Sequence, residues 1–195
     1  MALSTIQQPL VYRALSDTPA MRTLGFVLLA LAGSLIIAVA GQVKVPFWPV
    51  PVTMQTLAIF TIAAAYGSRL AVATLLLYLA EGAVGLPVFT NGGGLGYFAT
   101  SATTGYLVAF VIAAGLTGYA ADKGLARNPF ALFGVNLVGT IIILALGFAW
   151  IALHPAYGLD KAFAWGIGPF IWSDILKAAI AACLIPATAA FLSRK

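Results

Sequence analysis

The sequence predicts an all-α integral membrane protein, a compact bundle of six transmembrane helices with long, partly apolar outer loops. Of its 195 residues, 62% are hydrophobic and only 8% are charged. The mean hydropathy is +1.03. Apolar runs of about 20 residues, the length that crosses a bilayer, recur along the chain. A soluble globule of this size needs more polar surface than this composition supplies.

The apolar runs define six candidate spans, each close to the length that crosses about 30 Å of hydrocarbon. They cover residues 23–40, 53–67, 69–85, 104–121, 130–152 and 171–192. Residues 1–22 are expected to be an N-terminal cytoplasmic tail, because they lack the charged start, short apolar core and cleavage site of a signal peptide. Residues 23–195 are then a single six-helix transmembrane domain.

The basic residues predict the orientation of these spans. Six spans leave only Lys44 and Lys161 in the loops on one side of the membrane. The positive-inside rule therefore places both termini in the cytoplasm. The net charge of +5 is scattered singly rather than gathered on one face, so no nucleic acid is expected as a partner. The basic residues on the cytoplasmic side are Arg13, Arg22, Arg69, Lys123, Arg127, Arg194 and Lys195.

Two charged residues interrupt the last apolar stretch, residues 170–185. Asp174 and Lys177 lie three positions apart, so on a helix they share one face. A charged side chain at bilayer depth costs at least about 2.5 kcal/mol and usually faces the interior of a bundle or a solute path. The pair therefore predicts a solute site. The alternative is an ion pair that only neutralises itself.

Two predicted outer loops have unusual compositions. Residues 41–55 hold three prolines among aromatic and aliphatic residues, and residues 85–97 are rich in glycine. Proline prevents helix at its own position and disfavours it at the preceding one, so the first loop must be extended or turning. We expect both loops to fold back onto the bundle and to cover a cavity that opens outward.

Five segments together resemble the motifs of the BioY family, the biotin-binding S components of energy-coupling factor (ECF) vitamin transporters. The resemblance covers nearly all of the chain after residue 22. It implies the fold of an ECF S component, high-affinity biotin binding and biotin uptake across a prokaryotic plasma membrane. The segments are Gln42-Val-x-Val-Pro46, Val50-Pro-Val-Thr-x-Gln-Thr56, Gly85-Leu-Pro-Val-Phe89, Thr104-Gly-Tyr-Leu107 and Gly168-Pro-Phe-Ile-x-x-Asp-x-x-Lys177.

The resemblance implies which polar residues bind biotin. Asp174 accepts hydrogen bonds from the ureido N–H groups, and Lys177 pairs with Asp174, with the ligand carboxylate, or with both by turns. Asn91 and Gln55 are candidate ureido partners, since an amide offers a donor and an acceptor. Either amide can instead hold loop backbone in place.

The resemblance also implies an aromatic wall against the thioether ring and chain of biotin. Its candidate members are Tyr106, Phe89 and Trp172. The alternative for each ring is a place in the aromatic belt at the membrane interface.

A stripe of small residues, Ala30, Ser34 and Ala38, recurs every fourth position in the first span. Small residues let another helix approach closely, and the resemblance implies that a transmembrane coupling subunit binds here. Packing within one bundle is the alternative. The sequence has no Gly-x-x-x-x-Gly-Lys-Ser/Thr motif, so ATP is expected to be used only by ATPase partner subunits.

No cofactor and no metal site are expected, because the chain has one His and one Cys. A homo-oligomer is compatible with the sequence. Two other functions stay open: an S component for another vitamin, or a non-coupled carrier of small solutes. An intramembrane enzyme is not expected, since no nucleophile is accompanied by a base and His154 falls in an outer loop.

Overall fold

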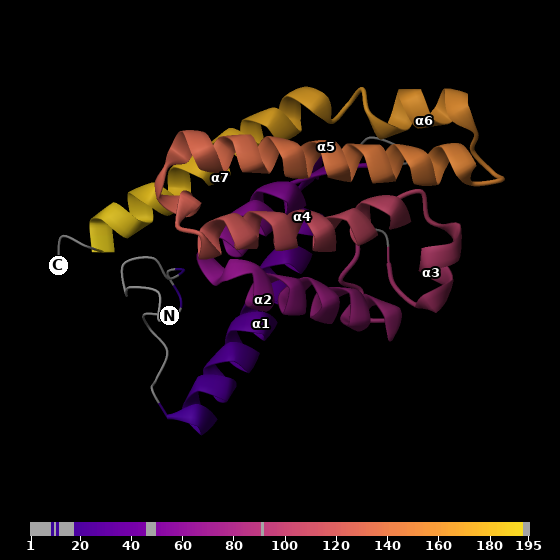
Figure 1. Ribbon diagram of the computed structural model, residues 1–195. Coiled ribbons are helices and arrows are strands. Elements are labelled where there is room, and N and C mark those ends of the chain that lie inside the picture. Colours follow the sequence, from indigo (N-terminus) through magenta and orange to yellow (C-terminus); the bar gives the residue numbers. More distant parts are fainter. Residues whose placement is uncertain (1–8, 10, 12–17, 46–49, 91, 193–195) are drawn as a thin grey trace.

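Five long helices form the body of the protein in the computed structural model, which describes residues 9, 11, 18–45, 50–90 and 92–192 (Figure 1). Each is long and apolar enough to cross a membrane. α1 begins at Pro19, a few residues before the first predicted span. The helices are α1 (Pro19–Gln42), α2 (Gln55–Ala83), α4 (Thr104–Asp122), α5 (Pro129–Leu153) and α7 (Ile171–Leu192).

Short elements connect these helices at the two ends of the bundle. α3 and α6 lie at the end opposite to the C-terminal part of α7 (Figure 1). We call the end with α3 and α6 the loop end, and the end with η2 the turn end. The short elements are β1 (Lys44–Val45), β2 (Val52–Thr53), α3 (Leu95–Thr100), η2 (Leu125–Arg127) and α6 (Leu159–Gly166).

α2 consists of two helical segments that fold back on each other at Gly67. Gly67 has a φ of 76° and a ψ of 172°, which is not helical. In a straight helix, Gln55 and Tyr78 would lie about 34 Å apart along the axis. Instead, the Gln55 amide nitrogen donates a hydrogen bond of 2.8 Å to the Tyr78 hydroxyl. α2 therefore supplies two of the six predicted spans, and the six-helix prediction is confirmed.

The reversal at Gly67 is held by the end of α4. The Ser68 backbone N–H donates to Oδ2 of Asp122 at 3.1 Å. The Ser68 hydroxyl donates to the same oxygen. A carboxylate at the start of a helix satisfies free N–H groups and suits the positive end of the helix dipole. A Cβ on Gly118 would lie 2.6 Å from Ser68 Cα, so this close approach requires glycine.

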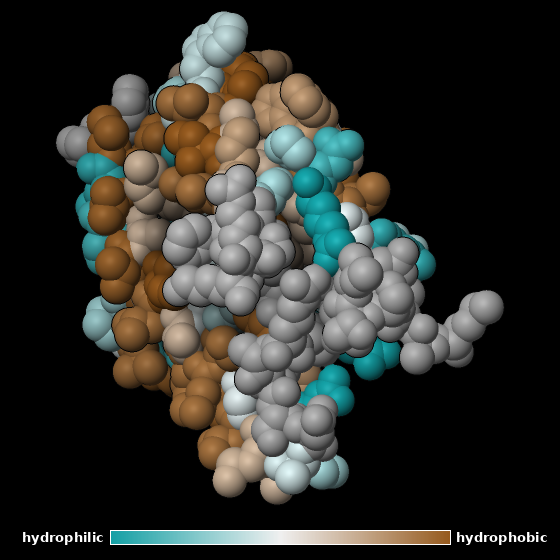
Figure 2. Space-filling model, turned by 90° about the vertical axis from the view of Figure 1, so that its left-hand side faces the viewer, coloured by the Kyte–Doolittle hydropathy of each residue, from teal (hydrophilic) through white to brown (hydrophobic). Residues whose placement is uncertain are grey.

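The surface of the bundle is apolar. In the most apolar 18-residue stretch of each helix, 61% of the residues of α2 and 67% of those of α4 are buried. The corresponding shares are 28% in α1 and 33% in α5. α1 turns Val27, Leu31 and Leu35 outward. Hydrophobic side chains cover much of the face in Figure 2, and hydrophilic ones gather in a limited part of it. Apolar surface of this extent is stable in contact with lipid, so the chain is an integral membrane protein.

A buried amide links three helices in the interior. Asn136 on α5 is fully buried, and its oxygen accepts a hydrogen bond of 3.2 Å from the Thr117 hydroxyl on α4. Its nitrogen donates to the Ala178 carbonyl on α7 at 3.2 Å. Buried polar groups need such partners, so this residue fixes the relative positions of α4, α5 and α7.

α3 is held in place by the loop-end terminus of α5 and by the loop that follows it. The Trp150 indole N–H donates to the Ser101 carbonyl at 2.8 Å, and the Tyr157 hydroxyl donates to the Thr100 carbonyl at 2.9 Å. Nε2 of His154 lies 3.1 Å from the Ala99 carbonyl. These groups satisfy the last carbonyls of α3, which have no partner within the helix.

Gly67→Ala is expected to lower the free energy of unfolding by about 1–3 kcal/mol, because the backbone conformation at Gly67 is open almost only to glycine. The added Cβ would also collide with Asp122. Chemical unfolding in detergent micelles measures the loss.

Gly134→Ala is the matched control, since Gly134 lies within α5 and a Cβ there would meet nothing within 4 Å. This control is expected to keep or slightly raise stability, because alanine favours helix over glycine. Equal stability of the Gly67→Ala variant and the unaltered chain would contradict the assigned reversal.

Candidate functional site

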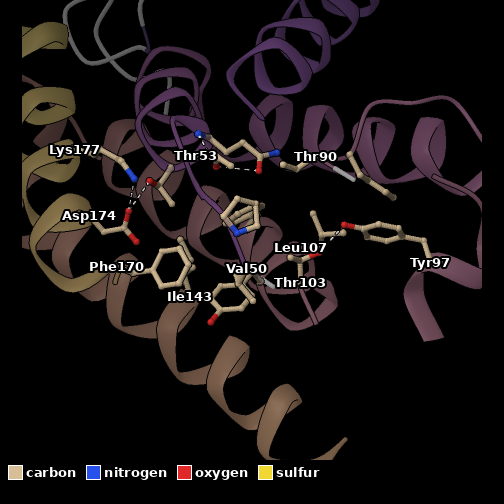
Figure 3. Close-up of a pocket in the computed structure, with 16 residues that line it drawn as sticks. Val50, Thr53, Thr90, Tyr97, Thr103, Leu107, Ile143, Phe170, Asp174 and Lys177 are labelled. Carbon is tan, nitrogen blue, oxygen red and sulfur yellow. Dashed lines mark hydrogen bonds and ion pairs between the residues drawn. The ribbon is translucent and has the colours of Figure 1, made fainter. Parts of the chain in front are cut away.

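A cavity lies between α2, α4, α5 and α7 beneath the connecting segments of the loop end (Figure 3). It has about 510 Å³ of space between atoms, including its open mouth. Both predicted outer loops contribute to its lining, the first through Val50, Pro51 and Thr53 and the second through Phe89, Thr90 and Tyr97.

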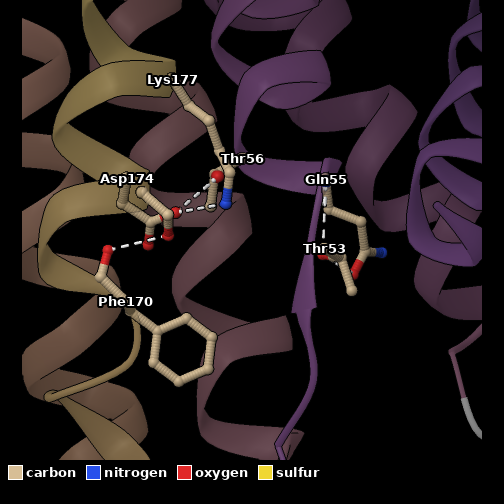
Figure 4. A network of polar contacts seen from close by, with 7 residues as sticks. Thr53, Gln55, Thr56, Phe170, Asp174 and Lys177 are labelled. Atoms are coloured by element: carbon tan, nitrogen blue, oxygen red, sulfur yellow. Dashed lines mark hydrogen bonds and ion pairs between the residues drawn. The ribbon is translucent and has the colours of Figure 1, made fainter. Parts of the chain in front are cut away.

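Asp174 and Lys177 form the charged end of this cavity. Their side chains make an ion pair of 2.8 Å between Nζ and Oδ1. The Thr56 hydroxyl on α2 donates to the same Asp174 oxygen at 3.0 Å (Figure 4). The two charged residues are 2% and 6% exposed. The structure thus places the predicted pair toward the bundle interior, where each charge is compensated by the other.

The ion pair keeps hydrogen-bonding capacity for a ligand. Within the described part of the chain, the hydrogen bonds that the Asp174 carboxylate accepts both go to Oδ1. Oδ2 can still accept, and the Lys177 ammonium has three hydrogens, of which Asp174 takes one. A strong acceptor therefore lies beside a strong donor at a cavity wall.

Gln55 also lines the cavity, but its amide is engaged within the protein. Its nitrogen donates to the Tyr78 hydroxyl, and its oxygen accepts from the Thr53 hydroxyl at 3.2 Å. The Tyr78 hydroxyl in turn donates to the Val88 carbonyl at 3.2 Å. This chain of hydrogen bonds ties the β2 segment, both halves of α2 and the 84–94 loop into one wall.

Hydroxyl groups line the end of the cavity opposite Asp174 and Lys177 (Figure 3). The Tyr97 hydroxyl and the Thr103 hydroxyl lie 2.8 Å apart. Thr53 and Thr90 also line the cavity. The sequence interpretation missed Thr56, Tyr97 and Thr103. For Thr56 a signal existed, because it is a polar residue beside Gln55 within a quoted motif; Tyr97 and Thr103 had no comparable signal.

Two of the three predicted aromatic residues form part of the wall. Phe89 is 2% exposed, lies against Gly82, and contacts Tyr97 with ring centroids 5.1 Å apart. Tyr106 packs against Phe170, with centroids 5.7 Å apart. The Tyr106 hydroxyl donates to the Gly166 carbonyl at 2.8 Å, which fixes the ring.

The prediction for Trp172 is wrong, because its side chain is 81% exposed and does not line the cavity. Trp172 lies two positions before Asp174, which is about 200° around the helix. It therefore faces outward when Asp174 faces inward. Asn91 lies outside the described residues, and its neighbour Thr90 lines the cavity.

The stripe predicted to bind a coupling subunit packs within the chain itself. The Ser34 side chain is buried and donates to Glu81 on α2 at 3.0 Å. Beside it, a Cβ on Gly33 would lie 2.7 Å from the Thr74 side chain. Ala30 and Ala38 are half-buried against the core. Ser34 therefore packs inside the bundle, and the binding of a coupling subunit at this stripe stays a prediction.

The bundle and its cavity define an integral membrane protein with a buried polar site between its helices. The sequence model of the BioY family matches residues 13–194, and the chain belongs to this family. The predicted family is thereby confirmed. Because this is a family of transporters, the chain is not an enzyme, as expected.

Curated relatives cover most of the chain. It is 33% identical over 174 residues to the biotin transporter BioY of Rhizobium etli, which covers 84% of this chain and 92% of the relative. It is 32% identical over 150 residues to the biotin transporter BioY of Thermotoga maritima, covering 76% of this chain and 86% of the relative.

A solved structure shares the fold. A crystal structure of the S-component for biotin from an ECF-type ABC transporter matches with a TM-score of 0.75 and 22% sequence identity. The match covers 89% of this chain and 95% of that one. The predicted fold of an ECF S component is therefore confirmed.

Removing one member of the Asp174–Lys177 pair is expected to destabilise the chain by about 3 kcal/mol, since it leaves the other charge buried and unpaired. The double variant Asp174→Asn/Lys177→Met leaves no such charge, so its loss should be smaller than the sum of the two single losses. Unfolding of the ligand-free protein in detergent micelles measures all three.

Asp160→Asn is the control, because Asp160 is an exposed carboxylate on α6. It should leave stability unchanged. Strictly additive losses for Asp174→Asn and Lys177→Met would contradict a coupled pair.

Proposed function

We propose that the chain binds biotin with high affinity and takes part in its uptake as the substrate-specific S component of an ECF-type ABC transporter. The observation that carries this proposal is the buried Asp174–Lys177 pair at the end of a cavity between membrane-spanning helices. The curated relatives named as biotin transporters support the choice of ligand.

The chemistry of biotin suits this cavity. A ureido group donates hydrogen bonds from two N–H groups and accepts them at its carbonyl oxygen. The ion pair offers Oδ2 of Asp174 as an acceptor and the Lys177 ammonium as a donor. Hydrogen bonds to charged groups are stronger than neutral ones. We therefore assign the ureido head to the charged end. The thioether ring and chain then lie along Phe170, Phe89 and Tyr106, which supply apolar surface.

The two amides receive different proposed roles. Gln55 already bonds Tyr78 and Thr53, so it shapes the wall and contacts the ligand without being its main polar partner. Asn91 remains a proposed ureido partner on the strength of its motif alone. No cofactor enters this function, because binding needs only the side chains of the cavity.

The partners proposed for uptake are a transmembrane coupling subunit and ATPase subunits. We place the chain in a prokaryotic plasma membrane with both termini in the cytoplasm. Among the described residues, the turn end carries Arg69, Lys123 and Arg127, whereas the connecting segments of the loop end carry Lys44 and Lys161. This distribution supports a cytoplasmic turn end and a cavity that opens to the exterior.

The isolated chain is expected to bind biotin tightly, desthiobiotin detectably and thiamine not at all. Desthiobiotin keeps the ureido ring but lacks the thioether bridge, so it retains the contacts to the charged end. Calorimetric titration of the purified protein with the three ligands measures this order. Preference for thiamine would favour an S component for another vitamin, and absence of heat with biotin would overturn the proposal.

ATP-dependent biotin uptake is expected only when the chain is reconstituted with coupling and ATPase subunits. The sequence carries no phosphate-binding loop of the Gly-x-x-x-x-Gly-Lys-Ser/Thr type. Uptake of labelled biotin into proteoliposomes, with ATP on the cytoplasmic face, measures the requirement. ATP-dependent uptake by the chain alone would contradict the proposed division of labour.

A further inference from the structure

The two polar ends of the cavity differ in charge. Asp174 and Lys177 cancel each other at 2.8 Å, so the charged end has no net attraction for an anion. The opposite end presents the neutral hydroxyls of Tyr97 and Thr103. Among the described residues that line this second end, none offers a positive charge to an ionised group of a ligand.

Two independent contacts place Lys44 at the edge of this cavity. In the antiparallel β1–β2 pair, Lys44 is directly opposite Thr53. Directly opposed residues point their side chains to the same face, and Thr53 lines the cavity. From the other side, the Lys44 ammonium donates a hydrogen bond of 3.0 Å to the carbonyl of Thr90, which also lines the cavity.

We propose that Lys44 recognises the carboxylate of the ligand at the cavity mouth. This inference rests on the proposed function and deepens it, because it assigns the end of biotin that the Asp174–Lys177 pair does not bind. The ammonium has three donors, and the Thr90 carbonyl uses one of them. The carboxylate accepts from the others, with the ureido head at the charged end.

The exposure of Lys44 determines how its effect will appear. Exposed charges at the rim of a site mainly raise the association rate and are screened by salt. Lys44 should therefore favour the binding of an anionic ligand over that of a neutral ligand of the same shape. Biotinamide, in which a carboxamide replaces the carboxylate, is that neutral ligand.

Lys161 provides a matched control at the same end of the molecule. It is exposed, and its ammonium donates to the Ala156 carbonyl at 3.2 Å. It thus resembles Lys44 in charge, exposure and kind of hydrogen bond. Ala156 does not line the cavity, so Lys161 lacks the contact on which the proposal depends.

The test compares biotin and biotinamide binding to the purified full chain and to Lys44→Met, Lys44→Arg and Lys161→Met. Lys44→Met should weaken biotin binding about two- to five-fold, the usual effect of an exposed charge, and should leave biotinamide binding unchanged. The biotin loss should come from slower association and should shrink as sodium chloride is raised. Lys44→Arg and Lys161→Met should bind both ligands like the unaltered chain.

The other end of the ligand gives a contrasting result. Asp174→Asn should weaken biotin and biotinamide equally, because both carry the ureido head. Equal losses for the two ligands in Lys44→Met would assign Lys44 a purely structural role and overturn the inference. A biotin-selective loss in Lys161→Met of the same size would also overturn it. Failure of the unaltered chain to bind either ligand would instead overturn the proposed function.

Discussion

The fold depends on keeping two opposite charges inside a bundle whose outer surface faces lipid. Asp174 and Lys177 are tolerated on α7 because each neutralises the other and because Thr56 on α2 adds a hydrogen bond. Breaking a buried pair is far more costly than never having it. The start of α2 must therefore lie beside α7, and the reversal at Gly67 lets both halves of α2 pack in the centre of the bundle.

The walls of the cavity are at the same time packing interfaces of the bundle. The Gln55–Tyr78–Val88 hydrogen bonds join segments far apart in the sequence, and Phe89 packs directly against Gly82. A side chain that shapes the site here also connects helices or loops. Substitutions in the wall consequently affect affinity and stability together, which is why controls on both are needed to assign a role.

The sequence was informative where the membrane itself restricts residue choice. The cost of polar groups in hydrocarbon predicts the membrane spans. The same cost predicts that the Asp174–Lys177 pair faces the interior of the bundle. Helical spacing from Asp174 also held the information that Trp172 faces outward. The neighbours of a side chain were not predictable: small residues around Ser34 suit any helix, and only the structure shows that α2 covers them. Tyr97 and Thr103 meet through a loop whose path no periodic pattern encodes.

The mutual neutralisation of Asp174 and Lys177 has an electrical consequence for the proposed transport. The pair adds no net charge of its own, and Lys44 stays with the protein when the ligand is released, so each transport cycle moves the single negative charge of the monoanionic vitamin. Inward movement of one negative charge against an inside-negative membrane potential requires about 2.3 kcal/mol per 100 mV if the whole voltage is crossed. The resting voltage of the cell thus opposes import through this pocket, and hydrolysis of a nucleotide by partner subunits is the kind of energy source that overcomes it.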